Sequence, residues 1–433
     1  MKVLFVGFAI TPYYRDFLNR LQQQGGVEVT NIRPCGENQH LGAGVHQDFS
    51  GREFRDDELE EYVIPAKRWF NLPDFEMSPQ CNSFLKLGST LTSLRPAVVI
   101  VNVNYHFAFH FDTKVVDAVK QCGCKVVFHS IPFQLPTHNE ALDGIDIPDN
   151  LPLRSLPSPA RMIISGLRLD RAYLRFVRRK AAVRQIRFRC DAFNTADSHA
   201  VYFEGGCEIY GSYGVPSEKI RVVRNSPNTA KLIDAADCHP PDRHPPARQG
   251  SRLIHIGRLV EWKRVDMLIR CVADLRSNGF PDTDLVVVGY GPQEEALRRL
   301  TAQLGLEDAI HFRGGIYDPN ELAVEFAKSS IYVMAGMGGL SINEAMCFRV
   351  PIVCSRGDGT EKFLVRDGKN GLYFRDGDQG SLTDVLAKLL GDHELRERMG
   401  HESRRIIEEE LNTQIHVANY LKLFTDLTVQ ASH

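Results

Sequence analysis

Short runs of apolar, mostly β-branched residues recur along the chain, and helix-like segments separate them. Clear examples lie at 2–7, 97–101, 125–129, 253–256 and 285–288. Strands without polar interruption are typical of a parallel sheet, because crossover helices cover both of its faces. A parallel connection also needs a dozen or more residues, and the helix-like segments supply them. The pattern therefore predicts an α/β fold with parallel sheets.

At 433 residues the chain is too long for one ordinary core, so we expect two domains. Asp237 to Pro246 is polar and rich in proline, which favours a linker. We therefore predict two Rossmann-like, doubly wound domains facing each other across a cleft, where two substrates can meet. The first domain is predicted at 1–230, the linker at 231–252 and the second domain at 253–415. A C-terminal helix at 416–433 is expected to reach back to the first domain.

Within the first domain the patterns predict helices, two short strands and a long loop. The helices are expected at 13–23, 83–94 and 112–122, the strands at 191–195 and 220–223, and the loop at 133–159. The second domain is expected to alternate strand and helix from 253 to 374. Residues 36–60 carry no clear pattern.

Composition excludes several classes of protein. The chain is 43% hydrophobic and 24% charged with a net charge of −2, so it has no overall attraction to nucleic acid. The amino terminus lacks the pattern of a signal peptide, and no apolar run reaches the roughly 18 residues of a membrane span. Ten scattered cysteines predict reduced, mostly buried thiols. Cys122-Gly-Cys124 is too tight for a zinc site, so we expect no metal centre and a cytoplasmic protein.

One stretch departs from this balance. Arg161 to Arg189 carries nine Arg and one Lys against a single acid, Asp170, with apolar residues interleaved. An ordinary surface helix with one buried face would give this composition. A helix that meets anionic phosphate or lipid head groups would give it too.

Cations and glycines follow the predicted strands of the second domain. Gly257 and Arg258 come directly after a strand, and Lys263 follows five residues later, so both cations can converge on one pyrophosphate. Glycines at 336, 338 and 339 precede a helix, where backbone N–H groups can face an anion. Glu344 on that helix can accept two ribose hydroxyls. Each feature taken alone has an ordinary alternative. The two cations could be solvated at the surface, the glycines could form a plain tight turn, and Glu344 could be an exposed helix residue.

The order and spacing of these motifs resemble the donor domain of family-4 glycosyltransferases. The resemblance is strongest over 250–395 and rests on Ile256-Gly257-Arg258-Leu259 with Lys263, Val288-Gly289-Tyr290-Gly291-Pro292, Phe312-Arg313-Gly314, Gly339-Leu340 with Glu344-Ala345-Met346, and Asp367-Gly368-Lys369-Asn370-Gly371. It extends more faintly to the first domain through Asp197-Ser198 and 214–225. Members of that family are retaining enzymes with the two-domain GT-B fold.

The resemblance implies roles for particular residues. Arg258 and Lys263 would bind the donor diphosphate, Glu344 the ribose, and His129, after a first-domain strand, would lie beside the transferred sugar. The implied donor site also includes the backbone at Gly7, Gly257, Gly314, Gly338, Gly339 and Leu340. The family usually has a second Glu eight residues before the ribose Glu, and this chain has Gly336 there.

Sugar transfer from a nucleotide needs positive charge or amide donors where the leaving diphosphate develops negative charge. A metal would require paired acids at a strand end, whereas Asp282 and Asp284 precede their strand and Asp376 and Asp378 look like a surface turn. We therefore expect metal-free catalysis through Arg258 and Lys263, with no cofactor besides a UDP- or GDP-type sugar donor. No carboxylate nucleophile is evident in the first domain, so a covalent intermediate is not supported. The resemblance favours front-face transfer to a glycan or lipid-linked acceptor.

Three other functions remain as alternatives. A dinucleotide-dependent oxidoreductase would need G-x-G-x-x-G, which neither domain contains. A nucleotide-sugar epimerase would act without an acceptor. A catalytically silent relative acting as a binding protein gains support from Gly336.

Overall fold

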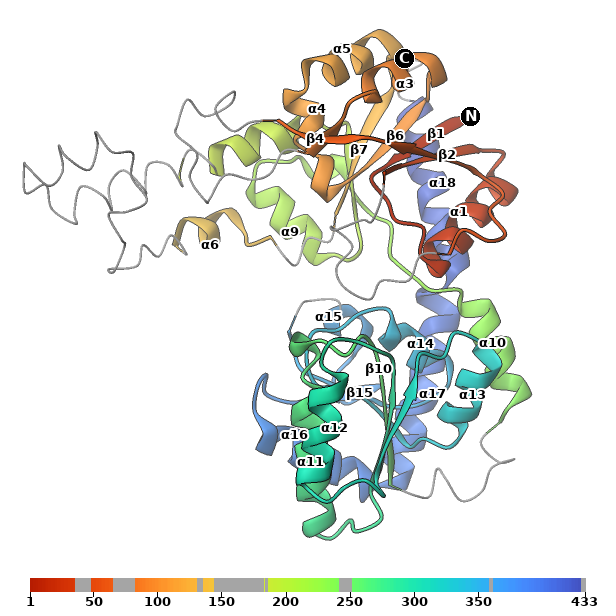
Figure 1. The fold of residues 1–433 in the computed structure, drawn as a ribbon. Coiled ribbons are helices and arrows are strands. Elements are labelled where there is room, and N and C mark those ends of the chain that lie inside the picture. Colours follow the sequence, from red (N-terminus) through yellow and green to blue (C-terminus); the bar gives the residue numbers. More distant parts are fainter. Residues whose placement is uncertain are drawn as a thin grey trace, which may run out of the picture.

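The chain forms two α/β domains in the computed structural model (Figure 1). The structure describes residues 1–35, 48–64, 82–130, 135–143, 183, 186–240, 251–357 and 361–429. The predicted fold class is confirmed. The Arg-rich stretch and the loop predicted at 133–159 lie mostly outside the described residues, as does the tail of the predicted linker.

The first domain is built on a seven-stranded parallel sheet. Its strand order is β3-β2-β1-β6-β7-β8-β9, with bounds Arg55–Leu59, Glu28–Pro34, Lys2–Val6, Val98–Asn102, Lys125–Ser130, Ser198–Val201 and Ile220–Val222. The helices of this domain are α1 (Pro12–Gly25), α3 (Leu87–Leu94), α4 (Ala108–Phe111), α5 (Thr113–Cys122), α6 (His138–Asp143), residues 186–194 and α9 (Gly205–Ser212). A small antiparallel pair, β4 (Glu61–Val63) and β5 (Asn82–Phe84), stands apart from the sheet.

The second domain has a six-stranded parallel sheet. Its order is β12-β11-β10-β13-β14-β15, with bounds Ile310–Gly314, Asp284–Val288, Arg252–Ile256, Ile331–Met334, Ile352–Cys354 and Gly371–Tyr373. The helices are α10 (Thr229–Cys238), α11 (Val265–Ser277), α12 (Glu294–Gln303), α13 (Pro319–Ala327), α14 (Ser341–Cys347), α15 (Glu361–Leu364), α16 (Gln379–Leu390) and α17 (His393–Glu410). The alternation predicted from 253 to 374 is confirmed.

Strand order reverses in each sheet between its first and its fourth strand in chain order, that is, at β1/β6 and β10/β13. In sheets of this kind ligands bind at that switch point, beyond the carboxyl ends of the strands. Each sheet is buried on both faces, as the apolar strands predict. Adjacent residues of β10, Leu253 and Ile254, are both 0% exposed and belong to separate cores on opposite faces.

Local sequence signals set several helix ends. Asp112, Asp318, Asp378 and Asp392 cap α5, α13, α16 and α17 by accepting hydrogen bonds from backbone N–H groups in the first turn. Gly123 ends α5 in the left-handed conformation at φ +65°.

The strand predicted at 191–195 is wrong. These residues fall at the end of the 186–194 helix and the turn after it, where Ala192 and Phe193 are buried. The strand lies a few residues later, at β8, and it was missed because Ser198 and His199 are polar. Both are nevertheless buried: the Ser198 hydroxyl donates to the Lys219 carbonyl at 2.7 Å, and a His199 ring nitrogen lies 2.9 Å from the Phe193 carbonyl.

The predicted linker at 231–252 begins inside a helix. Helix α10 continues to Cys238 and packs on α13 and α14, so this part belongs with the second domain. Of the nine described cysteines, four are buried and three are exposed, so the expectation of mostly buried thiols is not met. Among the described residues, no helix combines the length and apolarity that crossing a bilayer requires.

The last helix, α18 (Thr413–Val429), leaves the second domain and packs against α1 of the first (Figure 1). The His416 ring stacks on Phe17 with centroids 4.3 Å apart, and Tyr420 lies 5.0 Å from the same ring. Where the chain crosses between domains the two connections are bonded to each other: the Thr413 hydroxyl donates to the Pro227 carbonyl at 2.7 Å, and the Ser226 hydroxyl donates to the Leu411 carbonyl at 3.2 Å.

Phe424 of α18 tests this packing, because its side chain is 0% exposed in the first domain's core. We expect Phe424→Ala to lower the free energy of unfolding by about 3–5 kcal/mol, as for other buried aromatic truncations. The control Lys422→Ala, at an exposed position of the same helix, should change it by less than about 0.5 kcal/mol. Denaturant unfolding of both variants makes the comparison, and equal stabilities would contradict the packing described.

Candidate functional site

The loops after β10, β11 and β13 meet at the switch point of the second sheet. The Gly257 N–H donates to the Val288 carbonyl at 3.0 Å, and the Leu259 N–H donates to the Tyr290 carbonyl at 2.8 Å. The Met337 N–H donates to the Trp262 carbonyl at 3.1 Å. These bonds join the three loops into one backbone platform, which contains the predicted residues of the second domain.

Glycine is required at three places in this platform because backbones touch there. A Cβ on Gly289 would stand 1.9 Å from the Gly257 carbonyl oxygen, and one on Gly291 would stand 2.3 Å from that of Leu259. A Cβ on Gly336 would stand 2.0 Å from the Trp262 carbonyl oxygen. Real side chains do not approach backbone so closely, so any residue but glycine would push the loops apart.

Lys263 ties the platform together. It ends the short turn η7 (Glu261–Lys263) and is 8% exposed, so it is more enclosed than a cation at an open cleft surface. Its ammonium donates to the Met337 carbonyl at 2.6 Å and to the Gly338 carbonyl at 2.9 Å. The structure thus brings Lys263 into contact with the predicted glycine loop.

Arg258 lies at the start of the same turn. Its guanidinium carbon is 5.7 Å from the centre of the Trp262 ring, within the range of a cation–π contact. Arg258 and Lys263 therefore lie on one loop with Trp262, and the Lys263 ammonium reaches the glycine loop.

Glu344 lies in the first turn of α14, after Gly338, Gly339 and Leu340. Burial raises the pKa of its carboxyl group to about 7. Hydroxyl groups that donate to a carboxylate favour its charged form, so a bound diol would oppose the effect of burial. Gly314 ends β12 at φ +69° and its carbonyl accepts from the Gly289 N–H at 2.7 Å, which places it beside the β11 loop.

His129 and Gly7 belong to the first domain, at the carboxyl ends of β7 and β1. The His129 ring is 5% exposed and lies between Phe8 and Tyr202, with centroids 5.1 and 5.0 Å away. Burial lowers its pKa to about 3, so the ring is neutral near pH 7. Gly7 has φ +83°, and a Cβ there would stand 2.1 Å from the Tyr105 ring. Among the described residues, no hydrogen bond, ion pair or ring contact joins His129 or Gly7 to the second-domain platform.

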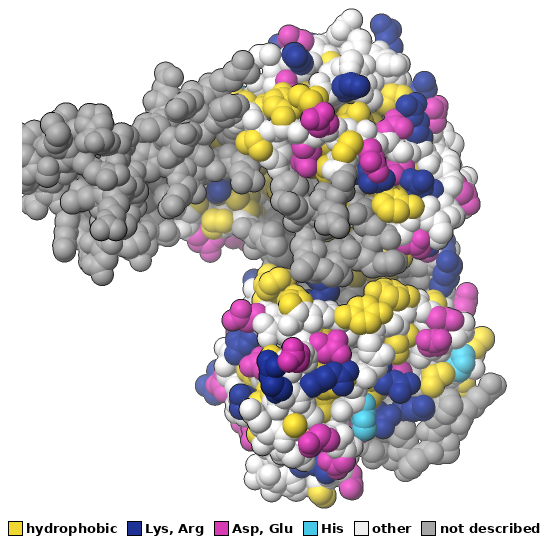
Figure 2. Space-filling model, viewed as in Figure 1, with side chains coloured by type: hydrophobic (Ala, Val, Ile, Leu, Met, Phe, Trp, Pro, Cys, Tyr) yellow, Lys and Arg dark blue, Asp and Glu magenta, His cyan; other side chains and the backbone are white. Residues whose placement is uncertain are grey.

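Sequence reasoning missed three aromatic residues on the same strand ends. Trp262, Tyr290 and Tyr317 are 46%, 50% and 60% exposed, and they follow β10, β11 and β12. The rings of Tyr290 and Tyr317 are 6.5 Å apart. The available signal was an aromatic residue one to six positions after each predicted strand. Figure 2 shows hydrophobic side chains along the edge of the second domain that faces the first.

The domains also meet through an aromatic contact. Phe203, after β8, stacks on Phe363 of α15 with centroids 5.9 Å apart and planes 5° apart. The Arg224 guanidinium is 5.7 Å from the Phe363 ring and is held by a two-bonded ion pair with Glu204. This contact holds α15 against the first domain.

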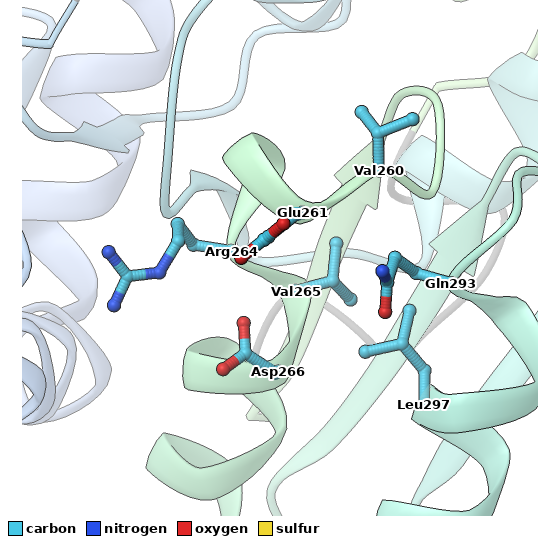
Figure 3. Close-up of a pocket in the computed structure, with 7 residues that line it drawn as sticks. All are labelled: Val260, Glu261, Arg264, Val265, Asp266, Gln293 and Leu297. Atoms are coloured by element: carbon cyan, nitrogen blue, oxygen red, sulfur yellow. The ribbon is translucent and has the colours of Figure 1, made fainter. Parts of the chain in front are cut away.

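A hollow of about 580 Å³ lies beside the platform, next to the turn that carries Lys263 (Figure 3). Its lining comes from η7 and the first turns of α11 and α12: Val260, Glu261, Arg264, Val265, Asp266, Gln293 and Leu297. No predicted site residue lines it, and the Arg264 side chain points away from the other six (Figure 3). Within the described parts of the chain, no group of three or more His, Cys, Asp or Glu side chains could hold a metal ion.

Comparison with known proteins supports this interpretation of the second domain. Residues 242–406 match the family model described as "Glycosyl transferases group 1". An uncharacterized glycosyltransferase of Methanocaldococcus jannaschii is 32% identical over 180 residues, which are 41% of this chain and 45% of that protein. The GDP-mannose-dependent alpha-(1-6)-phosphatidylinositol monomannoside mannosyltransferase of Mycolicibacterium smegmatis is 34% identical over 158 residues, 34% of this chain and 41% of that protein. The matches thus span less than half the length of these relatives.

Solved structures share the whole fold. HepE of Anabaena, crystallised with UDP, superposes with a TM-score of 0.64 over 98% of this chain and 100% of its own at 15% identity. Sucrose-phosphate synthase of Thermosynechococcus elongatus gives 0.62 over 99% and 100% at 16% identity. The fold is the two-domain GT-B arrangement of glycosyltransferases, and the segment 242–406 carries the sequence pattern of group 1 members.

Gly336 gives the first test of the platform. We expect Gly336→Ala to lower the free energy of unfolding by about 1–3 kcal/mol, because its Cβ meets the Trp262 backbone. Gly339→Ala is the matched control in the same loop: its Cβ would be 3.7 Å from the Lys263 ammonium, an ordinary contact, so the loss should stay under about 1 kcal/mol. Gly336→Glu carries the same clash and should reduce rather than improve any donor binding. A Gly336→Ala protein as stable as wild type would refute the crowding.

Proposed function

We propose that the protein is a glycosyltransferase that moves a sugar from a nucleoside diphosphate to an acceptor hydroxyl with retention of configuration. The observation that carries the proposal is the platform at the β10/β13 switch point. There the Lys263 ammonium bonds the glycine loop and Arg258 lies on the same loop as Lys263, while Glu344 follows the glycine loop in the first turn of α14; all lie in the segment that matches the group 1 family.

The proposed donor lies with its diphosphate against Arg258 and Lys263. These fixed cations stabilise the negative charge that grows on the leaving diphosphate, in a partly enclosed site where such charge is worth more than in water. Two ribose hydroxyls donate to Glu344. Gly257, Gly314, Gly338, Gly339 and Leu340 contribute backbone to the proposed donor site.

His129 is the first-domain candidate for contact with the transferred sugar. Its ring is neutral and its position is fixed by Phe8 and Tyr202. A neutral imidazole can accept or donate a hydrogen bond but does not bring a charge beside the anomeric carbon. Gly7 lies at the same edge of the first sheet, where the Tyr105 ring fills the space that a side chain would need.

We propose front-face transfer without a metal ion. Side-chain cations take the place of a divalent metal at the diphosphate, and a leaving phosphate oxygen helps to remove the proton of the acceptor hydroxyl. The departing group keeps the electron pair of the sugar–oxygen bond, and the acceptor oxygen forms the new bond on the same face.

The donor nucleotide is proposed to be of the UDP or GDP type. One relative is named as GDP-mannose-dependent, and HepE was crystallised with UDP. Another relative is a lipopolysaccharide core glycosyltransferase of Rhizobium meliloti, 27% identical over 240 residues. A glycan or lipid-linked acceptor on the cytoplasmic side of a membrane would agree with the names of the mannosyltransferase and the lipopolysaccharide core glycosyltransferase. With Gly336 in place of an acid, the donor sugar is one that needs no carboxylate at that position. The alternative is a protein that binds the nucleotide sugar without transferring it.

A donor screen tests the activity. UDP- and GDP-linked sugars are incubated with the protein in the presence of EDTA, and nucleoside diphosphate release is followed with and without acceptor glycolipid. Acceptor-dependent release supports a metal-free transferase. Release restored only by Mn²⁺ or Mg²⁺ would refute the metal-free step, and nucleotide binding without release would indicate a silent relative. Interconversion of the sugar without acceptor would indicate an epimerase.

Arg258→Ala and Lys263→Ala give the residue-level test with the donor found in that screen. Each substitution should reduce turnover about 10²-fold, or about 3 kcal/mol, because a cation facing the developing anion is lost. Replacement of Arg299, an exposed second-domain arginine paired with Glu295, is the control and should leave turnover unchanged. Near-normal turnover in either site variant would show that this loop does not hold the diphosphate.

The basic stretch from Arg161 to Arg189 is proposed to hold the enzyme at an anionic membrane surface. Near such a surface each Lys or Arg contributes about 1 kcal/mol, so a few are enough for reversible binding. The attraction is screened beyond about 10 Å at 0.1 M salt. A peripheral enzyme of this kind could reach an acceptor whose lipid anchor stays in the bilayer.

Vesicle sedimentation tests this proposal. Anionic vesicles should pull down the protein at low salt, and neutral vesicles or high salt should not. Changing Arg175, Arg178, Arg179 and Lys180 to Gln should abolish the effect. The control changes Arg298, Arg299, Arg375 and Arg405 to Gln, which removes the same charge from second-domain sites paired with acids. Equal binding to both vesicle types would leave a freely diffusing acceptor as the alternative.

A further inference from the structure

His106 is a buried histidine at the carboxyl end of the first sheet. It comes directly after the short turn η2 (Val103–Tyr105), which follows β6. Asn102 caps this turn, because its side chain accepts a hydrogen bond from the Asn104 N–H at 3.3 Å. The turn brings the His106 ring onto Phe128 of β7, where the two rings stack with centroids 4.2 Å apart and planes 8° apart. His106 is only 1% exposed in this position.

The His106 ring bonds the ends of two neighbouring strands. Its Nε2 lies 3.0 Å from the Val101 carbonyl oxygen of β6 and 3.1 Å from the His129 carbonyl oxygen of β7. A carbonyl oxygen only accepts, so Nε2 must carry a hydrogen and share it between the two oxygens. Burial lowers the pKa of the ring to about 3, so the ring is neutral near pH 7 and Nδ1 carries a lone pair. His106 thus joins β6 to the backbone of His129.

This arrangement has a cost. Nδ1 of His106 is buried and has no hydrogen-bond partner among the described residues. A buried polar atom in that state is unfavourable, and an apolar aromatic ring could stack on Phe128 without it. What His106 provides beyond the packing of a ring is therefore the N–H group that two carbonyls share.

The shared N–H group acts on His129 through its backbone. Phe128 and His129 are adjacent in β7, so their side chains point to opposite faces of the sheet. Phe128 belongs to the core on one face, whereas the His129 ring lies against Phe8 and Tyr202 on the other. His106 stacks on Phe128 and is therefore on the far side of the sheet from the His129 ring. By holding the His129 carbonyl it fixes the strand end from which that ring projects.

We propose that His106 is a positioning residue for His129: its Nε2–H group ties the end of β7 to β6 and so sets the direction in which the His129 ring faces the transferred sugar. This inference rests on the proposed function, because the sugar is the ligand that His129 would contact. His106 itself touches no ligand. Its loss should impair the transfer step and leave nucleotide binding by the second domain unchanged.

Two substitutions at His106 separate the hydrogen bond from the packing. His106→Phe keeps a ring against Phe128 and deletes the N–H donor. His106→Gln places an amide N–H near the Nε2 position, since both nitrogens lie the same number of bonds from Cα.

The matched control is His199→Phe in β8 of the first domain. His199 is also buried, its Nε2 donates to the Phe193 carbonyl at 2.9 Å, and its Nδ1 has no partner among the described residues. The same chemical change there removes a buried donor that does not bond His129.

The measurements are kcat and KM with the donor that the screen identifies, the affinity for UDP and GDP by calorimetric titration, and the melting temperature. We expect His106→Phe to lower kcat about tenfold, because a displaced group beside the sugar loses contacts made in the transition state. Its nucleotide affinity should stay within about twofold of wild type. His106→Gln should recover kcat to within about threefold. His199→Phe should keep a normal kcat although its melting temperature falls as well. In a His129→Ala background, His106→Phe should cause no further loss of kcat.

The outcomes distinguish this inference from the function on which it rests. Wild-type protein without acceptor-dependent release contradicts the proposed function and this inference with it. An active wild type with normal turnover in His106→Phe contradicts the positioning role alone. An equal fall of kcat in His199→Phe, or a further fall in the His129→Ala background, would show that His106 only supports the core. Weakened nucleotide binding by His106→Phe would also overturn the positioning role, because the effect would not be confined to His129.

Discussion

The direct contact of backbone with backbone at Gly257/Gly289, Leu259/Gly291 and Trp262/Gly336 is the constraint on which the rest of the site depends. Because no side chain separates these loops, their peptide groups bond to one another, and the loops behave as one surface. The glycines are therefore structural first, and they leave the space above the strands open as a consequence. The same crowding leaves no room for the Cβ of any side chain at Gly336.

Charge placement follows from that surface. Lys263 lies in it with its ammonium bonded to two carbonyls of the glycine loop, so the cation is fixed before any ligand arrives. Prior fixation matters for catalysis, because donors that are already oriented need no reorganisation as the leaving group becomes charged. Arg258, next to the exposed Trp262 ring, provides a second cation on the same turn.

Apolar strand patterns predicted both sheets well, because burial on two faces leaves little room for polar residues. The pattern failed at β8, where the polar residues Ser198 and His199 are buried and each bonds a backbone carbonyl through its side chain. A strand was predicted instead at the end of the preceding helix. At the site, motif spacing gave the cations and glycines in their correct loops. It could not give the two carbonyl partners of Lys263 or the enclosure of His129 by Phe8 and Tyr202. Those features arise from contacts between segments far apart in the chain.

The path of α18 bears on how the chain acquires its structure during synthesis. One of the two cores of the first domain includes Val417, Tyr420, Leu423, Phe424 and Leu427, so that core is complete only after nearly all of the chain has been made. The cores of the second domain need nothing beyond Leu411. A nascent chain emerging from the ribosome would therefore finish its second domain first and expose an apolar face of its first domain until the final helix docks. During that interval the amino-terminal half is a natural client for chaperones.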